Sequence, residues 1–136
     1  MRHLVLVLGD QLDPAASVYD DFDPAQDAVW MAEVAEESTH VWSHRARIAL
    51  FLAAMRHHRD ALRARGFTVH YRGLDEHAAP SLAAALAEDL PRLAPRAVRW
   101  TKPGDWRVEQ ALRAVVAAAG RALEERADRH FYATPD

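Results

Sequence analysis

The first residues that could do chemistry are Gly9-Asp10-Gln11, which directly follow an unbroken apolar run. A glycine lets the backbone approach a ligand closely, and a carboxylate next to an amide can hydrogen-bond the polar atoms of a ring or a sugar. The alternative is a turn in which Asp10 and Gln11 bond to their own backbone. The patterns GxGxxG and GxxxxGK[ST] are absent, which disfavours a dinucleotide-dependent dehydrogenase and an ordinary NTPase.

A second polar group follows the apolar run at residues 28–32. If this segment is helical, Glu33, Glu37, His40 and His44 lie along one side, at spacings of four, three and four. Such a set could hold a divalent metal ion, but HExxH is absent, and acidic residues near a helix start more often meet solvent or cap the helix. We therefore predict an organic ligand near these carboxylates and no metal site.

Other residues with chemical potential have structural alternatives. His57 and His58 cannot both face one metal ion, because adjacent helical residues point about 100° apart, and His58 is predicted to lie at the edge of the core. The arginines between residues 45 and 65 are interpreted as a solvated helix face. Trp100 and Trp106 flank a predicted loop, where they either stack on a flat ligand or pack in the core.

No Ser/His/Asp order, pair of catalytic carboxylates or activated lysine emerges from these segments. Taken alone, the residues favour a module that binds a small ligand over an enzyme.

The segments that must position these residues alternate between strands and helices. Short β-branched and leucine runs predict strands, and apolar residues recurring every three or four positions predict helices. Helix ends are expected at Gly66, Pro91 and Gly120, and Asp105 is an expected N-cap. The predicted strands are residues 4–8, 28–32, 67–71, 97–101 and 122–125; the predicted helices are residues 44–65, 81–90 and 105–120; residues 13–27 are predicted to form an irregular surface connection.

This alternation predicts an α/β fold, a doubly wound, mainly parallel five-stranded sheet flanked by helices, with residues 4–8 as the central strand. Residues 1–136 are expected to form a single domain of this Rossmann-like kind. In such sheets ligands bind beyond the carboxyl ends of the strands, where the strand order reverses. That rule selects five places: residues 9–11, 33–34, 71–75, 102–106 and 128–131.

Composition narrows the classes of partner. With a formal net charge of −3, nothing pulls the whole chain toward nucleic-acid phosphates or anionic lipid. The chain has no cysteine, so these residues cannot form a disulfide or hold a thiolate-bound zinc ion or iron–sulfur cluster. No apolar run approaches membrane-spanning length and no signal peptide is recognisable, so we expect a cytoplasmic protein without a membrane partner.

The order of several short motifs resembles that of the prokaryotic photolyase-related family, which includes the iron–sulfur bacterial cryptochromes and photolyases. GDQL and AMRH, in this order and each on the element expected for it, are the most specific of these motifs. The resemblance covers almost the whole chain. The motifs are LVLVLGDQL from Leu4, MAEV from Met31, HRARIALF from His44, AMRH from Ala54, LRARGFTVHY from Leu62, PGDWR from Pro103 and DRHF from Asp128.

The resemblance implies a flavoprotein that repairs ultraviolet photoproducts in DNA or senses blue light. It implies that this chain corresponds to an N-terminal antenna domain that holds 6,7-dimethyl-8-ribityllumazine, a small-molecule chromophore. FAD and a [4Fe–4S] cluster would belong to a helical domain expected outside this chain, and damaged DNA would be met only by the full-length protein. By the same resemblance, the lumazine-binding residues would be Leu8, Gly9, Asp10, Glu33, Val34 and Glu37, with His44 and Arg47 nearby.

Three functions remain open on the sequence. The first is the antenna domain of a photolyase-related flavoprotein, with no catalytic activity in this chain by itself. The second is a free-standing nucleotide-binding or signalling module on the same fold. The third is a scaffold that has lost its ligand and docks to a helical partner.

Overall fold

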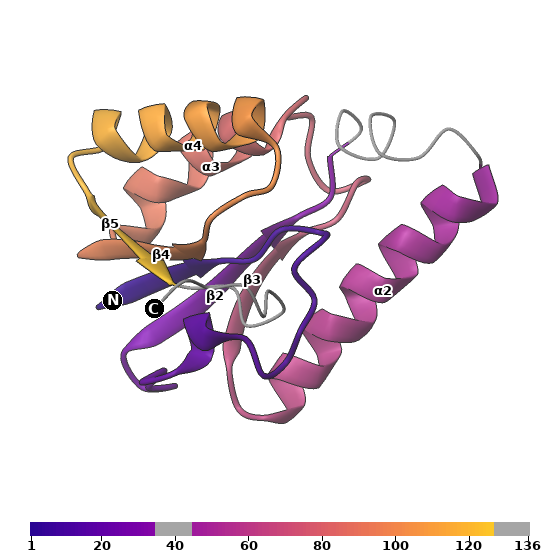
Figure 1. The fold of residues 1–136 in the computed structure, drawn as a ribbon, viewed down its shortest axis with the longest axis horizontal. Helices are drawn as coiled ribbons and strands as arrows, with labels where there is room; N and C mark the ends of the chain where they lie inside the picture. Colours follow the sequence, from indigo (N-terminus) through magenta and orange to yellow (C-terminus); the bar gives the residue numbers. More distant parts are fainter. Residues whose placement is uncertain (35–44, 127–136) are drawn as a thin grey trace, which may run out of the picture.

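A computed structural model describes residues 1–34 and 45–126, with residues 45–48 described by their backbone alone. All strand pairs are parallel, and the strands form one sheet in the order β3-β2-β1-β4-β5 (Figure 1). The predicted fold class is thus confirmed, with the first strand in the centre. The strands are β1 (His3–Leu6), β2 (Asp27–Ala32), β3 (Thr68–Arg72), β4 (Ala97–Thr101) and β5 (Ala122–Arg126).

Helices cover both faces of the sheet. Figure 1 shows α3 and α4 together over one face and α2 across the other. Among the described residues, no helix combines the length and apolarity that a membrane span needs. The helices are the 3-10 helix η1 (Ser17–Tyr19) and the α-helices α2 (Arg45–Ala64), α3 (Leu82–Leu93) and α4 (Trp106–Ala118).

The central strand and the residues that follow it contribute side chains to two separate hydrophobic cores. Leu4, Leu6 and Leu8 face the cluster that contains α3 and α4, whereas Val5 and Val7 face the cluster that contains α2. All five side chains are almost fully buried. Because successive strand residues point to opposite faces, an unbroken apolar run is what a strand covered on both sides requires.

Two helix boundaries test the expectations from sequence. Asp105 is the N-cap of α4, and its carboxylate accepts hydrogen bonds from the backbone N–H groups of Arg107 and Val108. Pro91 was expected to end a helix, but α3 runs through it to Leu93. Pro91 lies in the last turn on the exposed side. Proline has no backbone N–H, so water can donate instead to the carbonyl one turn earlier that this N–H would have bonded.

The predicted surface connection at residues 13–27 is partly wrong, because η1 is buried within it. On this face α2 covers the half of the sheet around β2 and β3, and η1 packs beside β4 instead. Tyr19 joins the α2 core and lies against the ring of Phe67. The short 3-10 helix η1 therefore takes the place of an α-helix over this part of the sheet.

A buried hydrogen bond joins η1 to α2. The Tyr19 hydroxyl lies 2.8 Å from Nε2 of His58, whose side chain is 4% exposed. The prediction that His58 sits at the core edge is confirmed. Burial, with the nearby Arg65 guanidinium, lowers the pKa of His58, and burial also raises the pKa of Tyr19. Both groups are thus neutral in the folded protein near neutral pH.

We predict that this pair makes stability depend on pH. Because the pKa of His58 is lower in the folded than in the unfolded chain, its contribution is fully present above the unfolded value of about 6.5 and is lost as pH falls below it. The substitution His58→Gln keeps a hydrogen-bonding group but removes the titration. Thermal unfolding between pH 8 and pH 5 should show a smaller fall in Tm for this variant than for the wild type.

The exposed neighbour provides the control. His57→Gln should retain the wild-type dependence of Tm on pH, since His57 is exposed on the same helix. Equal slopes for the wild type and His58→Gln would contradict the assignment.

Candidate functional site

The strand order reverses between β1 and β4. From β1 the chain moves outward to β2 and β3, and then crosses to β4 on the other side of β1. The loops that leave β1 and β4 therefore part from each other at the carboxyl edge of the sheet. This is the place where open α/β sheets bind their ligands.

A cavity of about 230 Å³ lies at this edge. Its walls are mainly apolar and come from the end of β1, the end of β2, α2 and the first turns of α3 and α4. Three residues predicted to bind the ligand, Leu8, Asp10 and Val34, line it. The full lining is Leu8, Asp10, Val34, Phe51, Ser81, Leu82, Ala83, Pro103, Gly104, Asp105, Arg107, Val108, Ala111 and Leu112.

A neighbouring side chain explains why glycine occupies position 9. A Cβ atom at this position would overlap the ring of Phe51 from α2. The prediction that a ligand approaches Gly9 closely stays a prediction; what the structure adds is that the packing of α2 against the end of β1 already requires a small residue here. Phe51 in turn forms part of the cavity wall.

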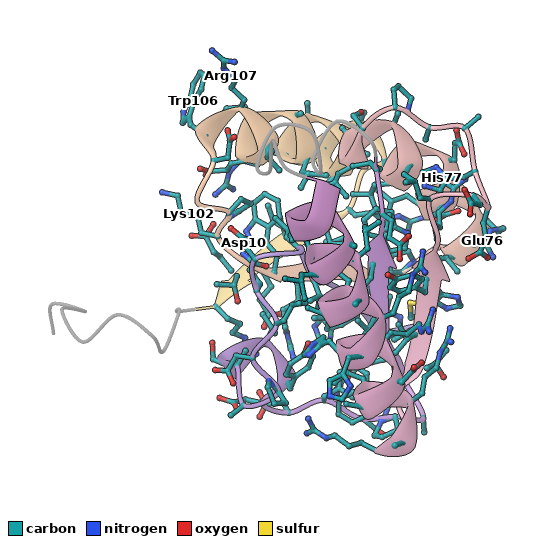
Figure 2. All side chains as sticks on the ribbon, turned by 90° about the vertical axis from the view of Figure 1, so that its right-hand side faces the viewer. Asp10, Glu76, His77, Lys102, Trp106 and Arg107 are labelled. Atoms are coloured by element: carbon teal, nitrogen blue, oxygen red, sulfur yellow. The ribbon has the colours of Figure 1, made fainter. Side chains whose placement is uncertain are left out.

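Asp10 is exposed at the rim of the cavity and also borders a second, open hollow of about 360 Å³ next to Thr101. Figure 2 labels Asp10 and Lys102 and shows Trp106 and Arg107 projecting outward from the start of α4. Trp106 is 70% exposed, whereas Trp100 is buried in the core. The core alternative predicted for these two tryptophans is therefore correct for Trp100 and wrong for Trp106. Of the two acidic residues that were predicted to bind the ligand and that the structure describes, Asp10 lines the cavity and Glu33 does not.

Glu33 is engaged differently. Its side chain is buried, and Arg56 binds it with two hydrogen bonds, Nε to Oε2 at 2.7 Å and Nη2 to Oε1 at 2.8 Å. The Tyr71 hydroxyl also donates to Oε2, and the backbone N–H of Leu74 donates to Oε1 at 2.9 Å. These four donors occupy the acceptor positions that an ionised carboxylate offers. Glu33 thus joins β2 to α2, β3 and the loop after β3, and it does not line the cavity.

The charge of Glu33 is stabilised by these partners. Burial by itself would raise the pKa of this carboxyl group, but the hydrogen bonds from Arg56, Tyr71 and Leu74 outweigh that effect and lower it. Glu33 raises the pKa of Arg56 in return, and burial together with Glu33 raises that of Tyr71. The carboxylate stays ionised throughout the physiological range.

The arginines of α2 are used more fully than a solvated face implies. Arg56 binds Glu33, Arg59 lies over the ring of Tyr71, and Arg63 donates to the backbone oxygen of Val69. Arg65 lies over the ring of Phe67. These partners lie outside α2, so the helical spacing of the arginines did not predict the contacts.

Several predicted positions fall outside what the structure describes. Glu37 and His44 lie in residues 35–44, the candidate segment at 128–131 lies in residues 127–136, and the side chain of Arg47 is not described. Within residues 1–34 and 45–126, no three histidine or acidic side chains are placed to hold a metal ion.

Some cavity residues had no signal of their own in the sequence. Phe51 was assigned to an apolar helix face and Asp105 to a helix cap, and both assignments are correct. That the same residues also enclose a cavity depends on how α2 and α4 meet the end of β1.

Comparison with known proteins identifies the family. The family model described as deoxyribodipyrimidine photo-lyase-related protein matches residues 5–136. The chain belongs to this family. A (6-4) photolyase of Agrobacterium fabrum (strain C58) is 36% identical over 132 residues, which is 96% of this chain and 26% of that protein. The chain therefore spans about a quarter of the length of the curated relative it matches, and the resemblance read from the motifs is confirmed.

The Glu33 network should contribute strongly to stability. Glu33→Ala leaves the Tyr71 hydroxyl and the Leu74 N–H without their acceptor, so we expect a loss of about 2–3 kcal/mol in the free energy of unfolding. Half of the Arg56 side chain is exposed and can turn to solvent, which keeps the loss below that of a fully enclosed ion pair. Urea denaturation measures it.

Glu88→Ala is the matched control, because Glu88 pairs with Arg72 at the surface. Its loss should not exceed about 0.5 kcal/mol, as for other exposed positions. Similar losses in the two variants would show that Glu33 is not the central acceptor of this network.

Proposed function

We propose that this chain is the antenna domain of a photolyase-related flavoprotein and that the cavity at the carboxyl edge of its sheet holds the chromophore. The observation that carries the proposal is the cavity itself, an apolar space at the reversal of strand order with Asp10 at its rim. Family membership supplies the class of protein, and the position of the cavity supplies the site.

The dimensions and chemistry of the cavity suit a flat heterocycle such as 6,7-dimethyl-8-ribityllumazine. Its volume of about 230 Å³ is slightly below the range of roughly 300–1,000 Å³ typical of ligand pockets, so it suits one fused ring system better than a dinucleotide. Leu8, Val34 and Phe51 offer apolar surface for ring faces. Asp10 offers an acceptor to ring N–H groups or to the hydroxyls of a ribityl chain.

The role of Glu33 in this proposal is indirect. Because Arg56, Tyr71 and Leu74 already occupy its oxygens, Glu33 would support the ligand by holding the end of β2 in place and not by accepting hydrogen bonds from it. Val34 follows Glu33 and lines the cavity, so this support acts through the backbone.

The reaction of the whole protein is part of the same proposal. A lumazine bound here would absorb light and pass the excitation to FAD, which drives repair of ultraviolet photoproducts in DNA or signals blue light. This chain has no cysteine to hold an iron–sulfur cluster, so the cluster would be bound by other residues of the full-length protein. The family resemblance implies the same for FAD and damaged DNA.

Lumazine binding should depend on Asp10 and on an open cavity. Asp10→Ala removes an acceptor from a partly desolvated site, and we expect affinity to fall about ten- to a hundred-fold. Ala111→Trp places an indole in the cavity from α4 and should weaken binding more than tenfold. Titration of the protein with 6,7-dimethyl-8-ribityllumazine, followed by its fluorescence, measures both effects.

Ala117→Trp is the control, since Ala117 is exposed on the same helix and does not line the cavity. It should bind as the wild type does. Unchanged affinity in Ala111→Trp would exclude this cavity, and tighter binding of an adenine nucleotide than of lumazine would favour a nucleotide-binding module.

A further inference from the structure

The gap between β1 and β4 is closed by a side chain. Backbone pairing between the two strands ends at Leu6 and Trp100. Beyond this point the backbone N–H of Val7 bonds to Trp30 on β2, and Thr101 pairs with Arg126 on β5. Each strand thus continues with its outer neighbour, and the facing edges of β1 and β4 need other partners.

Gln11 supplies these partners from the turn that follows β1. Its Nε2 donates to the backbone oxygen of Thr101 at 3.0 Å, and its Oε1 lies 3.4 Å from the backbone nitrogen of Leu8. A side-chain amide carries the same donor and acceptor as a peptide group. The amide of Gln11 therefore takes the place of the next peptide rung between the two strands.

This bridge also holds the turn that carries Asp10. The backbone N–H of Gln11 donates to the backbone oxygen of Leu8 at 2.9 Å, which closes a tight turn over residues 8–11. The other end of the bridge is Thr101, directly before the loop of residues 102–105 that borders the cavity. The two loops at the rim are thus tied to each other across 90 residues of sequence.

We propose that Gln11 is the positioning residue of the ligand site, because its amide fixes the separation of the β1 and β4 loops and so the place of Asp10 at the cavity rim. The inference rests on the proposed function, in that the cavity is taken to be the ligand site. Gln11 itself lies in the lining of the neighbouring hollow and not in that of the cavity.

A positioning role predicts a specific separation of effects. Gln11 is half-buried and adjoins the open hollow, so water can reach the Leu8 N–H and the Thr101 carbonyl when the amide is removed. The fold should then persist while the rim loops lose their register. Ligand affinity should consequently fall much more than global stability.

The experiment compares three variants by lumazine titration and by amide hydrogen exchange. Gln11→Leu keeps the approximate size but loses both hydrogen bonds, and should bind at least ten times more weakly than the wild type. It should also exchange faster at residues 8–13 and 101–105 but not in the core strands. Gln110→Leu, on the exposed face of α4, should match the wild type in both measurements.

Gln11→Glu adds a second measurement, the pH dependence of ligand affinity, which a purely structural role of Gln11 would not change. At neutral pH its carboxylate would face the Thr101 carbonyl and repel it, so binding should be weak. As pH falls toward the pKa of a glutamic acid, about 4.3, the protonated acid can donate to that carbonyl. The ratio of its affinity to that of the wild type, measured at each pH, should therefore rise as pH falls from 7 to 5.

The outcomes separate this proposal from the function on which it rests. If the wild type does not bind lumazine, the proposed function fails. The role of Gln11 as a bridge is then tested by hydrogen exchange alone, and faster exchange confined to the rim loops of Gln11→Leu would support it. Wild-type affinity in Gln11→Leu, unchanged exchange at the rim, or no recovery in Gln11→Glu at low pH would each overturn the proposal. Loss of protection throughout the sheet would also overturn it, because Gln11 would then be a structural residue.

Discussion

The fold depends on the fact that β1 is paired along both edges and covered on both faces. Beyond its first residue, His3, this strand has no side that meets water, so the residues that follow must be apolar and must fit one of two cores. Leu4 and Leu6 fill the core under α3 and α4, and Val5 fills the core under α2. Polar groups can then occur only where the strand ends, which brings Gly9, Asp10 and Gln11 to the carboxyl edge.

The two faces of the sheet are held by different interactions. On the α3 and α4 side the core includes two large buried tryptophans, and each indole N–H is satisfied by a carboxylate, Trp30 by Asp89 and Trp100 by Glu125. On the α2 side, Glu33 adds an ionic network at the end of β2. That network uses the Glu33 carboxylate completely, whereas the described acidic residues in the cavity lining are Asp10 and Asp105.

The family match gives the class of protein to which the chain belongs, and the structure gives the cavity and the residues around it. The family match places the chain among photolyase-related proteins, and its relative from Agrobacterium fabrum is a (6-4) photolyase about four times as long as the matched region. What these residues themselves offer is a cavity, an acidic rim and loops held in register.

The sequence by itself determined the parallel sheet, the central place of its first strand and the edge of the sheet where the cavity lies. It could do so because apolar runs, helical spacing and glycine or aspartate at helix ends are local signals of burial and capping. Only the tertiary structure decided what each polar side chain does at that edge. Glu33 and Asp10 look alike in the sequence, each following an apolar strand, yet Glu33 is saturated by Arg56, Tyr71 and Leu74 while Asp10 meets the cavity. The difference arises because hydrogen-bond partners come from segments 23 to 90 residues away, and a sequence pattern carries no information about which of them arrive at the same point.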